Sequence, residues 1–205
     1  MKVNINFQNS IQLNDNIYID PYKLDSFTEA KYIFITHSHY DHLSLEDIKK
    51  IYTANTIVIA PKDCVDALLS ISVNKDNIVI VEPNKEYSLE DISFKTVPSY
   101  NINKSFHPKE NNWVGYLINI DNEISYIVGD SDYIEEMNNI KCNNLFIPIG
   151  GVYTMNVDEA IEAIKVINPD TIYPTHYGPI IPNSDKNGII LQDKLKENYN
   201  VKLFL

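Results

Sequence analysis

The sequence contains no arginine, although 17 lysines are present among its 205 residues. With 28 acidic residues, the formal net charge is -11. Arginine is the side chain best suited to bidentate phosphate contacts, and nucleic-acid binding usually begins with clustered positive charge. The composition therefore disfavours nucleic acid as a partner. A single phosphate group is still acceptable, because a few lysines beside two cations can hold it.

Cysteine is also scarce, with Cys64 and Cys142 far apart in the sequence. Neither has a second cysteine at the short spacing typical of a thiolate zinc site, and two cysteines do not form a disulfide framework. We expect both to be reduced residues of the core.

Long apolar runs are absent as well. No stretch reaches the ~18 apolar residues that a membrane span requires, and residues 1–6 alternate where a signal peptide would be continuously apolar. With 44% hydrophobic residues, the chain can bury a substantial core. We expect a soluble, cytoplasmic protein, without a membrane partner, that forms a single domain over residues 1–205.

The hydrophobic pattern predicts an α/β fold with two mixed sheets and helices outside them. Alternation over residues 3–19 predicts a β meander, and the apolar run 32–35 predicts a buried strand. Helices are expected to begin after Ser44, near Pro61 and after Asn156. The remaining expected elements are strands at 56–60, 78–81, 94–97, 114–120, 124–128, 145–149, 171–173 and 201–204, and a last helix at 192–198.

Three of the five histidines lie in one loop between a predicted strand and a predicted helix. His37 and His39 are two residues apart, so in an extended loop they project to the same side and can share one ion. Asp41 and His42 come where the loop turns into the helix, and they can serve a second ion. Neutral imidazole suits zinc, iron and related divalent ions. Two ions held ~3.5 to 4 Å apart can share one hydroxide and polarise a substrate oxygen.

Two strand ends carry further candidate ligands. Asp130 follows Gly129, and its two carboxylate oxygens could bridge two cations; an ordinary turn with a capping aspartate is the alternative. We expect Asp132 to cap a short helix. His176 follows the apolar strand 171–173, and together with the other histidines it is a candidate ligand.

His107 lies in a polar loop, where a mobile surface histidine is the alternative to a ligand. Lys104 and Lys109 flank it and could attract an anionic group, or they could simply be solvated. Tyr100, Trp113 and Tyr153 are candidates for substrate contact.

The sequence His-Ser-His-Tyr-Asp-His at residues 37–42 resembles the HxHxDH signature of the metallo-β-lactamase-fold hydrolases. This resemblance implies an αβ/βα four-layer sandwich. It implies one metal held by His37, His39 and His107, a second held by Asp41, His42 and His176, and Asp130 bridging them. Residues 148–155 and 175–178 are similar to the compact branch that includes ascorbate-6-phosphate lactonase. Residues 97–101 lack the histidine turn of glyoxalase II and the true β-lactamases, which argues against their activities.

The predicted function is that of a metal-dependent hydrolase, in which hydroxide from the paired metals attacks a carbonyl or phosphoryl centre of a small ester, lactone, amide or phosphoester. The metals would lower the pKa of water from ~15.7 toward ~7. We predict His39, Asp41 and Asp130 as catalytic residues, with Asp41 orienting the nucleophile. Asp20 either supports a ligating imidazole or is a simple turn residue before proline. The ions are expected to be two Zn²⁺, with Mn²⁺, Fe²⁺ or Ni²⁺ as alternatives.

Two other function classes stay open. A phosphodiesterase or nuclease would need a basic surface that this chain lacks. A non-hydrolytic redox or binding protein, as in flavodiiron proteins, would exchange a histidine for a carboxylate and add a flavin domain. The substrate and the oligomeric state, a homo-oligomer included, are not indicated by the sequence.

Overall fold

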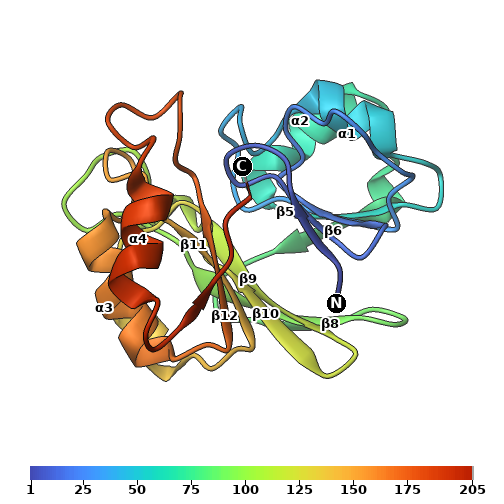
Figure 1. Ribbon diagram of the computed structural model, residues 1–205. Helices are drawn as coiled ribbons and strands as arrows, with labels where there is room; N and C mark the ends of the chain where they lie inside the picture. The colour runs from blue at the N-terminus through green and yellow to red at the C-terminus, as the bar shows by residue number, and fades with distance from the viewer. Residues whose placement is uncertain (205) are drawn as a thin grey trace. The chain divides into compact units, whose positions relative to one another are not determined.

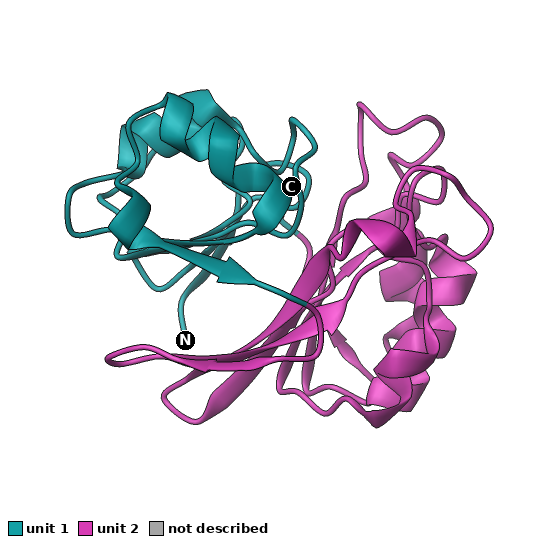
Figure 2. Ribbon diagram, turned by 180° about the vertical axis from the view of Figure 1, so that it is seen from behind, with its two compact units in different colours: residues 1–82, 204 teal, residues 83–203, 205 magenta. Residues whose placement is uncertain are grey.

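A computed structural model describes residues 1–204 and divides them into two compact units (Figure 2). Unit 1 comprises residues 1–82 with residue 204, and unit 2 comprises residues 83–203. Within residues 1–204, every helix is too short or too polar to span a bilayer. The prediction of one domain over the whole chain stays a prediction.

Unit 1 contains a mixed six-stranded sheet whose strands follow the order of the chain (Figure 1). The first three strands are antiparallel, and the remaining pairings are parallel. The predicted β meander and the buried strand after it are thereby confirmed. The strands are β1 (Val3–Ile5), β2 (Ile11–Leu13), β3 (Ile17–Ile19), β4 (Tyr32–Phe34), β5 (Ile57–Pro61) and β6 (Ile78–Val81).

One face of this sheet is covered by α1 (Leu45–Ile51) and α2 (Val65–Ser70) (Figure 1). The helices contribute Ile48, Ile51 and Leu68 to a core that also contains Ile33 and Val58 from the central strands. The 3₁₀ helices η1 (Lys62–Cys64) and η2 (Lys75–Asn77) precede α2 and β6. Burial of the apolar side chains between sheet and helices holds the unit together.

Unit 2 contains a mixed seven-stranded sheet in the order β13-β12-β11-β10-β9-β8-β7. The strands β10 to β13 are parallel, and β7 to β10 pair antiparallel. The strands are β7 (Glu86–Ser88), β8 (Ser93–Pro98), β9 (Val114–Ile120), β10 (Glu123–Ile127), β11 (Asn144–Pro148), β12 (Thr171–Thr175) and β13 (Asn200–Val201). The turn between β9 and β10 has Asp121 and Asn122 at φ 52° and 65°, which is typical of a two-residue hairpin.

Helices α3 (Val157–Ile167) and α4 (Asn187–Leu195) cover one face of this sheet (Figure 1). Asn156 caps α3 in a capping box with Glu159, which confirms the predicted start. Two 3₁₀ helices, η3 (Lys109–Asn111) and η4 (Glu135–Asn139), lie in the loops. The predicted fold class, α/β with two mixed sheets flanked by helices, is confirmed.

Two predicted elements need correction, and one strand was not predicted. The last helix begins at residue 187 and ends at 195. It therefore includes Ile190 and Leu191, which precede the predicted start at residue 192. The strand predicted at 201–204 is shortened to Asn200–Val201. The sequence did not predict β7, whose polar residues give no clear alternation. Cys64 and Cys142 are both free, and burial raises the pKa of each thiol, that of Cys142 to about 12.

The carboxylate of Asp47 joins α1 to the loop that follows β3. Its oxygens accept hydrogen bonds from the backbone amides of Lys23 and Leu24, at 2.9 and 3.1 Å. They also accept from Ser44 Oγ at 2.7 Å and from Lys50 Nζ at 2.8 Å. Ser44 in turn accepts a bond from the Asp47 amide and caps the helix, as predicted.

Replacing Asp47 by asparagine is expected to lower the free energy of unfolding by about 1–3 kcal/mol. The NH₂ group of asparagine would face N–H or O–H groups that now donate hydrogen bonds to the carboxylate. Urea unfolding at neutral pH measures the change. The control is Asp66→Asn, on the exposed side of α2, which should change the free energy by less than about 0.5 kcal/mol. Equal values for the two variants would contradict the role given to Asp47.

The same network predicts a pH dependence. Burial alone would raise the pKa of Asp47, but bonds from Lys50, Ser44, Leu24 and Lys23 outweigh it, and the net pKa is lowered. Asp47 therefore stabilises the fold above its unfolded pKa of about 4, and this contribution is lost as pH falls toward the folded pKa. The difference between wild type and Asp47→Asn should shrink in that acidic range.

Candidate functional site

The predicted histidine motif lies in the loop between β4 and α1, as expected. The amides of His42 and Leu43 both donate to the carbonyl oxygen of His39, at 3.0 and 2.8 Å, and this turn leads the chain into the helix. His37, Asp41 and His42 are buried, and His39 is half-buried. Polar side chains are rarely buried in such number unless they are bonded or hold an ion.

His37 and His39 present nitrogen atoms to one another. His37 Nε2 lies 3.1 Å from His39 Nδ1, with the two rings edge to face. Two nitrogens bound to one tetrahedral zinc at its usual bond lengths would be about 3.3 Å apart. The spacing of this pair therefore suits a shared ion, and the prediction that both side chains project to the same side is confirmed.

The proton on His37 is placed by its neighbour Thr36. The Thr36 hydroxyl donates its hydrogen to Asp20 Oδ2 at 2.7 Å, so it can only accept from His37 Nδ1 at 2.9 Å. His37 therefore carries its proton on Nδ1. Its Nε2 keeps the lone pair that faces His39.

Asp20 supports His42 in the same manner. His42 Nδ1 lies 2.7 Å from Asp20 Oδ2, and both side chains are fully buried. Asp20 also accepts from the Thr36 amide at 2.8 Å and from Asn9 Nδ2 at 2.7 Å. The parallel register, which pairs Ile19 with Phe34, brings Asp20 beside the motif loop. Of the two predicted roles for Asp20, the structure supports that of a partner to an imidazole.

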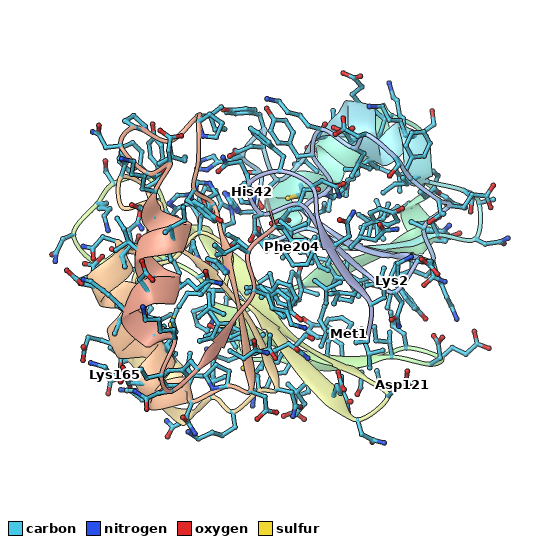
Figure 3. All side chains as sticks on the ribbon, in the orientation of Figure 1. Met1, Lys2, His42, Asp121, Lys165 and Phe204 are labelled. Carbon is cyan, nitrogen blue, oxygen red and sulfur yellow. The ribbon has the colours of Figure 1, made fainter. Side chains whose placement is uncertain are left out.

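Asp41 lies next to the outer nitrogen of His42. The distance from Asp41 Oδ2 to His42 Nε2 is 3.7 Å. Because Asp20 occupies the Nδ1 side of His42, the Nε2 side is the one that can bind an ion together with Asp41. Figure 3 labels the buried His42.

In unit 2, two histidines converge on Asp130. His107 Nε2 lies 3.3 Å from Asp130 Oδ2, and His176 Nε2 lies 3.0 Å from the same oxygen. All three residues are buried, so a mobile surface position for His107 is wrong. The three side chains therefore lie together within unit 2, and their roles as metal ligands stay predictions.

His176 is placed by the parallel pairing of β11 with β12. His176 directly follows Thr175 and has a left-handed φ of 50°. The Ile149 amide donates to the Thr175 carbonyl at 3.1 Å, which continues the pairing of the two strands. A Cβ at Gly150 would lie 2.5 Å from the His176 carbonyl oxygen, so only glycine permits this close approach. Gly150 therefore has a steric reason beside the histidine, and Gly151 has a left-handed φ of 85° that favours glycine.

The polar neighbours of His107 differ from the prediction. Asp132 does not cap η4, which begins after Ile134 without a side-chain cap. Instead, it accepts hydrogen bonds from Asn101 Nδ2 at 3.2 Å and from the Ile102 amide at 2.9 Å, and it pairs with Lys104. Sequence reasoning missed Asn101, because an asparagine in a polar loop carries no distinguishing pattern.

Lys109 and the predicted aromatic residues also have structural partners. Lys109 Nζ lies 3.1 Å from Glu136 Oε1 and 3.1 Å from the Tyr100 hydroxyl. The buried Trp113 ring packs edge-on against His107, with ring centroids 5.6 Å apart. Tyr153 contacts the exposed Phe106 ring. Lys109, like Lys104, is therefore engaged with an acidic side chain.

The donor chemistry of both units fits divalent transition metals. Each unit offers imidazole nitrogens and a carboxylate, and no cysteine lies among them. Such nitrogen and oxygen sets suit zinc, manganese, iron or nickel.

Comparison with known proteins places the chain in a family. The pattern described as a beta-lactamase superfamily domain matches residues 10–177. The UPF0173 protein of Pyrococcus abyssi is 32% identical over 169 residues, which cover 80% of this chain and 75% of the relative. The UPF0173 metal-dependent hydrolase of Nanoarchaeum equitans is 28% identical over 193 residues, which cover 83% of this chain and 81% of the relative.

Solved structures agree with this placement. The chain is similar to a Parabacteroides distasonis protein regarded as a metal-dependent hydrolase, with a TM-score of 0.82 and 27% identity over 98% of this chain and 91% of that one. It shares its fold with Igni18, a metallo hydrolase of Ignicoccus hospitalis, with a TM-score of 0.81 and 19% identity over 98% of this chain and 94% of that one. The chain therefore belongs to the metallo-β-lactamase superfamily and, within it, to the UPF0173 family. The likeness to the ascorbate-6-phosphate lactonase branch stays a prediction.

Replacing Asp20 by asparagine is expected to destabilise unit 1 and to misplace His42. Oδ2 of Asp20 accepts from Asn9, Thr36 and His42, and Oδ1 accepts from the Thr36 amide, so an amide NH₂ would face a donor in either orientation. We expect the free energy of unfolding of the EDTA-treated protein to fall by about 1–3 kcal/mol. Metal affinity should fall about 10- to 100-fold.

Urea unfolding and metal titration measure the two effects. Asp25→Asn is the matched control, because it makes the same chemical change at an exposed position of the same unit. If Asp20→Asn binds metal and unfolds like Asp25→Asn, the support assigned to Asp20 is wrong.

Proposed function

We propose that this protein, a metal-dependent hydrolase of the beta-lactamase superfamily, uses two divalent cations to hydrolyse a small ester, lactone, amide or phosphoester. The observation that carries the proposal is the convergence of His107 and His176 on one oxygen of Asp130. A carboxylate that faces two imidazoles, each assigned to a different ion, suits a bridging ligand.

The proposed donors follow the order of the superfamily's ligands along the chain. One ion would be held by three imidazoles and the other by two imidazoles and a carboxylate, with a second carboxylate shared. The sets are His37, His39 and His107 for the first ion, Asp41, His42 and His176 for the second, and Asp130 for both. The spacing of His37 and His39 within unit 1 supports the first set.

When bound, the ions would supply Lewis acidity and lower the pKa of a water molecule. The side chains have separate roles around this chemistry. Asp41 would orient the attacking water and accept its proton, since its carboxylate lies beside His42. Asp20 and Thr36 would keep two imidazoles in the required protonation state.

A small substrate is favoured over nucleic acid. The net charge is -11, and the two lysines nearest to His107 in sequence, Lys104 and Lys109, pair with Asp132 and Glu136. A polyanionic chain would find little positive charge there. Lactones are a first choice for assay, because of the resemblance to the lactonase branch.

The first test is metal analysis of protein purified without chelators, followed by assays with lactones, thioesters and phosphodiesters. We expect about two metal ions per chain, zinc first, and hydrolysis that EDTA abolishes. In His39→Ala and Asp130→Asn, kcat/KM should fall at least about 100-fold, and the metal content should also fall.

The control for Asp130→Asn is Asp121→Asn, at the tip of the turn between β9 and β10 (Figure 3). This variant makes the same chemical change and should keep full activity. Two results would overturn the proposed function. One is full turnover by His39→Ala, and the other is a protein that neither contains nor binds zinc, manganese, iron or nickel.

A further inference from the structure

An imidazole binds a metal through a nitrogen that carries a lone pair, so its other nitrogen must hold the proton. We propose that Asn101 is the positioning residue of His107. Its side-chain oxygen holds His107 with the proton on Nδ1, so that the Nε2 lone pair is directed toward Asp130. The inference deepens the proposed function, on which it rests for the role of His107 as a ligand.

Hydrogen bonding fixes the orientation of the Asn101 amide group. The His107 backbone N–H can only donate, and it lies 3.1 Å from Asn101 Oδ1. At the other end of the amide, Nδ2 faces two acceptors, Asp132 Oδ1 at 3.2 Å and the Tyr153 carbonyl at 2.9 Å. Exchanging oxygen and nitrogen would place donors against donors and acceptors against acceptors.

The protonation state of His107 follows from this orientation. His107 Nδ1 lies 3.0 Å from the same Asn101 Oδ1. An amide oxygen has no hydrogen to give, so Nδ1 must donate and therefore carries the proton. The other nitrogen, Nε2, is the one that lies 3.3 Å from Asp130 Oδ2.

Hydrogen bonds of the backbone hold Asn101 beside His107. The Asn101 amide donates to the His107 carbonyl at 2.8 Å, while the His107 amide donates back to the Asn101 side chain. The intervening loop is thus closed by bonds in both directions. Trp113 packs against the imidazole edge-on and limits its rotation.

Asp132 anchors the far side of Asn101. It also accepts from the Ile102 amide and pairs with Lys104, and its own amide donates to the Tyr100 carbonyl at 3.0 Å. Asn101 and Asp132 are both buried. The amide group therefore cannot turn over without losing its bonds to Asp132 and to the Tyr153 carbonyl and placing its own oxygen against these two acceptors, which is costly.

The test uses ¹⁵N NMR of the histidine side chains in metal-free protein, at a pH about one to two units above the ordinary histidine value of about 6.5. The His107 signals are assigned by their loss in His107→Gln. In wild type we expect the proton on Nδ1. In Asn101→Ala we expect the population to shift toward the tautomer with the proton on Nε2, because the acceptor for Nδ1 is gone while Asp130 Oδ2 still lies 3.3 Å from Nε2.

Asn101→Asp is the conservative variant. It keeps an oxygen acceptor for Nδ1, so the tautomer of His107 should be retained. The free energy of unfolding should fall, because the new carboxylate faces Asp132. A merely structural role for Asn101 would predict loss of stability in both variants without a change of tautomer in either.

Metal titration provides the second readout. Affinity should fall about 10- to 100-fold in Asn101→Ala and be largely retained in Asn101→Asp. The matched control is Asn143→Ala, whose side chain likewise joins a backbone amide, that of Ile124, to an aspartate, Asp170. Asn143 precedes β11, at the opposite end of the strand from Gly150, and its removal should leave the tautomer unchanged.

Two results would overturn the inference. One is a wild-type His107 that carries its proton on Nε2 and none on Nδ1, which is decisive even if Asn101→Ala does not fold. The other is a folded Asn101→Ala variant with the wild-type tautomer and the metal affinity of Asn143→Ala. If the wild type binds no metal, the proposed function fails, whereas the tautomer measurement still decides the role of Asn101.

Discussion

Three of the five candidate imidazole ligands depend on one interaction, a buried oxygen that accepts the Nδ1 hydrogen of the ring. Thr36 provides this oxygen for His37, Asp20 for His42 and Asn101 for His107. An imidazole with its proton held on one side keeps its lone pair on the other, without any need for an ion to impose that state. The conformational entropy of the ring is lost when the protein folds and not when the metal binds. This is the physical basis of a site prepared for metal.

The two sheets place these residues by the same topological rule. In unit 1, Asp20 and the motif loop follow the parallel strands β3 and β4. In unit 2, Asp130, Gly150 and His176 follow β10, β11 and β12, which are also parallel. The carboxyl ends of parallel strands lie at one edge of a sheet, so loops that are distant in sequence become neighbours there. Asn101 and His107 lie instead in the loop between the antiparallel strands β8 and β9.

Much of the fold and part of the site were predictable because they rest on local patterns. The alternation of residues 3–19, the apolar strand β4 and the caps at Ser44 and Asn156 each depend on a few neighbouring residues. The spacing of His37 and His39 likewise fixes their common direction. The last helix and β7 were misjudged or missed, since a weakly amphipathic helix and a polar edge strand carry little periodic signal.

The sequence by itself determined the fold class and the supply of imidazoles and carboxylates, because hydrophobic period and motif spacing are properties of adjacent residues. Only the tertiary structure decided that Asp132 accepts a hydrogen bond from Asn101 instead of capping a helix. It also decided that the oxygen of Asn101 lies at hydrogen-bond distance from His107 Nδ1. Asn101 and Asp132 are 31 residues apart in the chain. A hydrogen bond between two polar loop residues at that separation leaves no trace in composition or periodicity, and it exists only once the strands between them have paired.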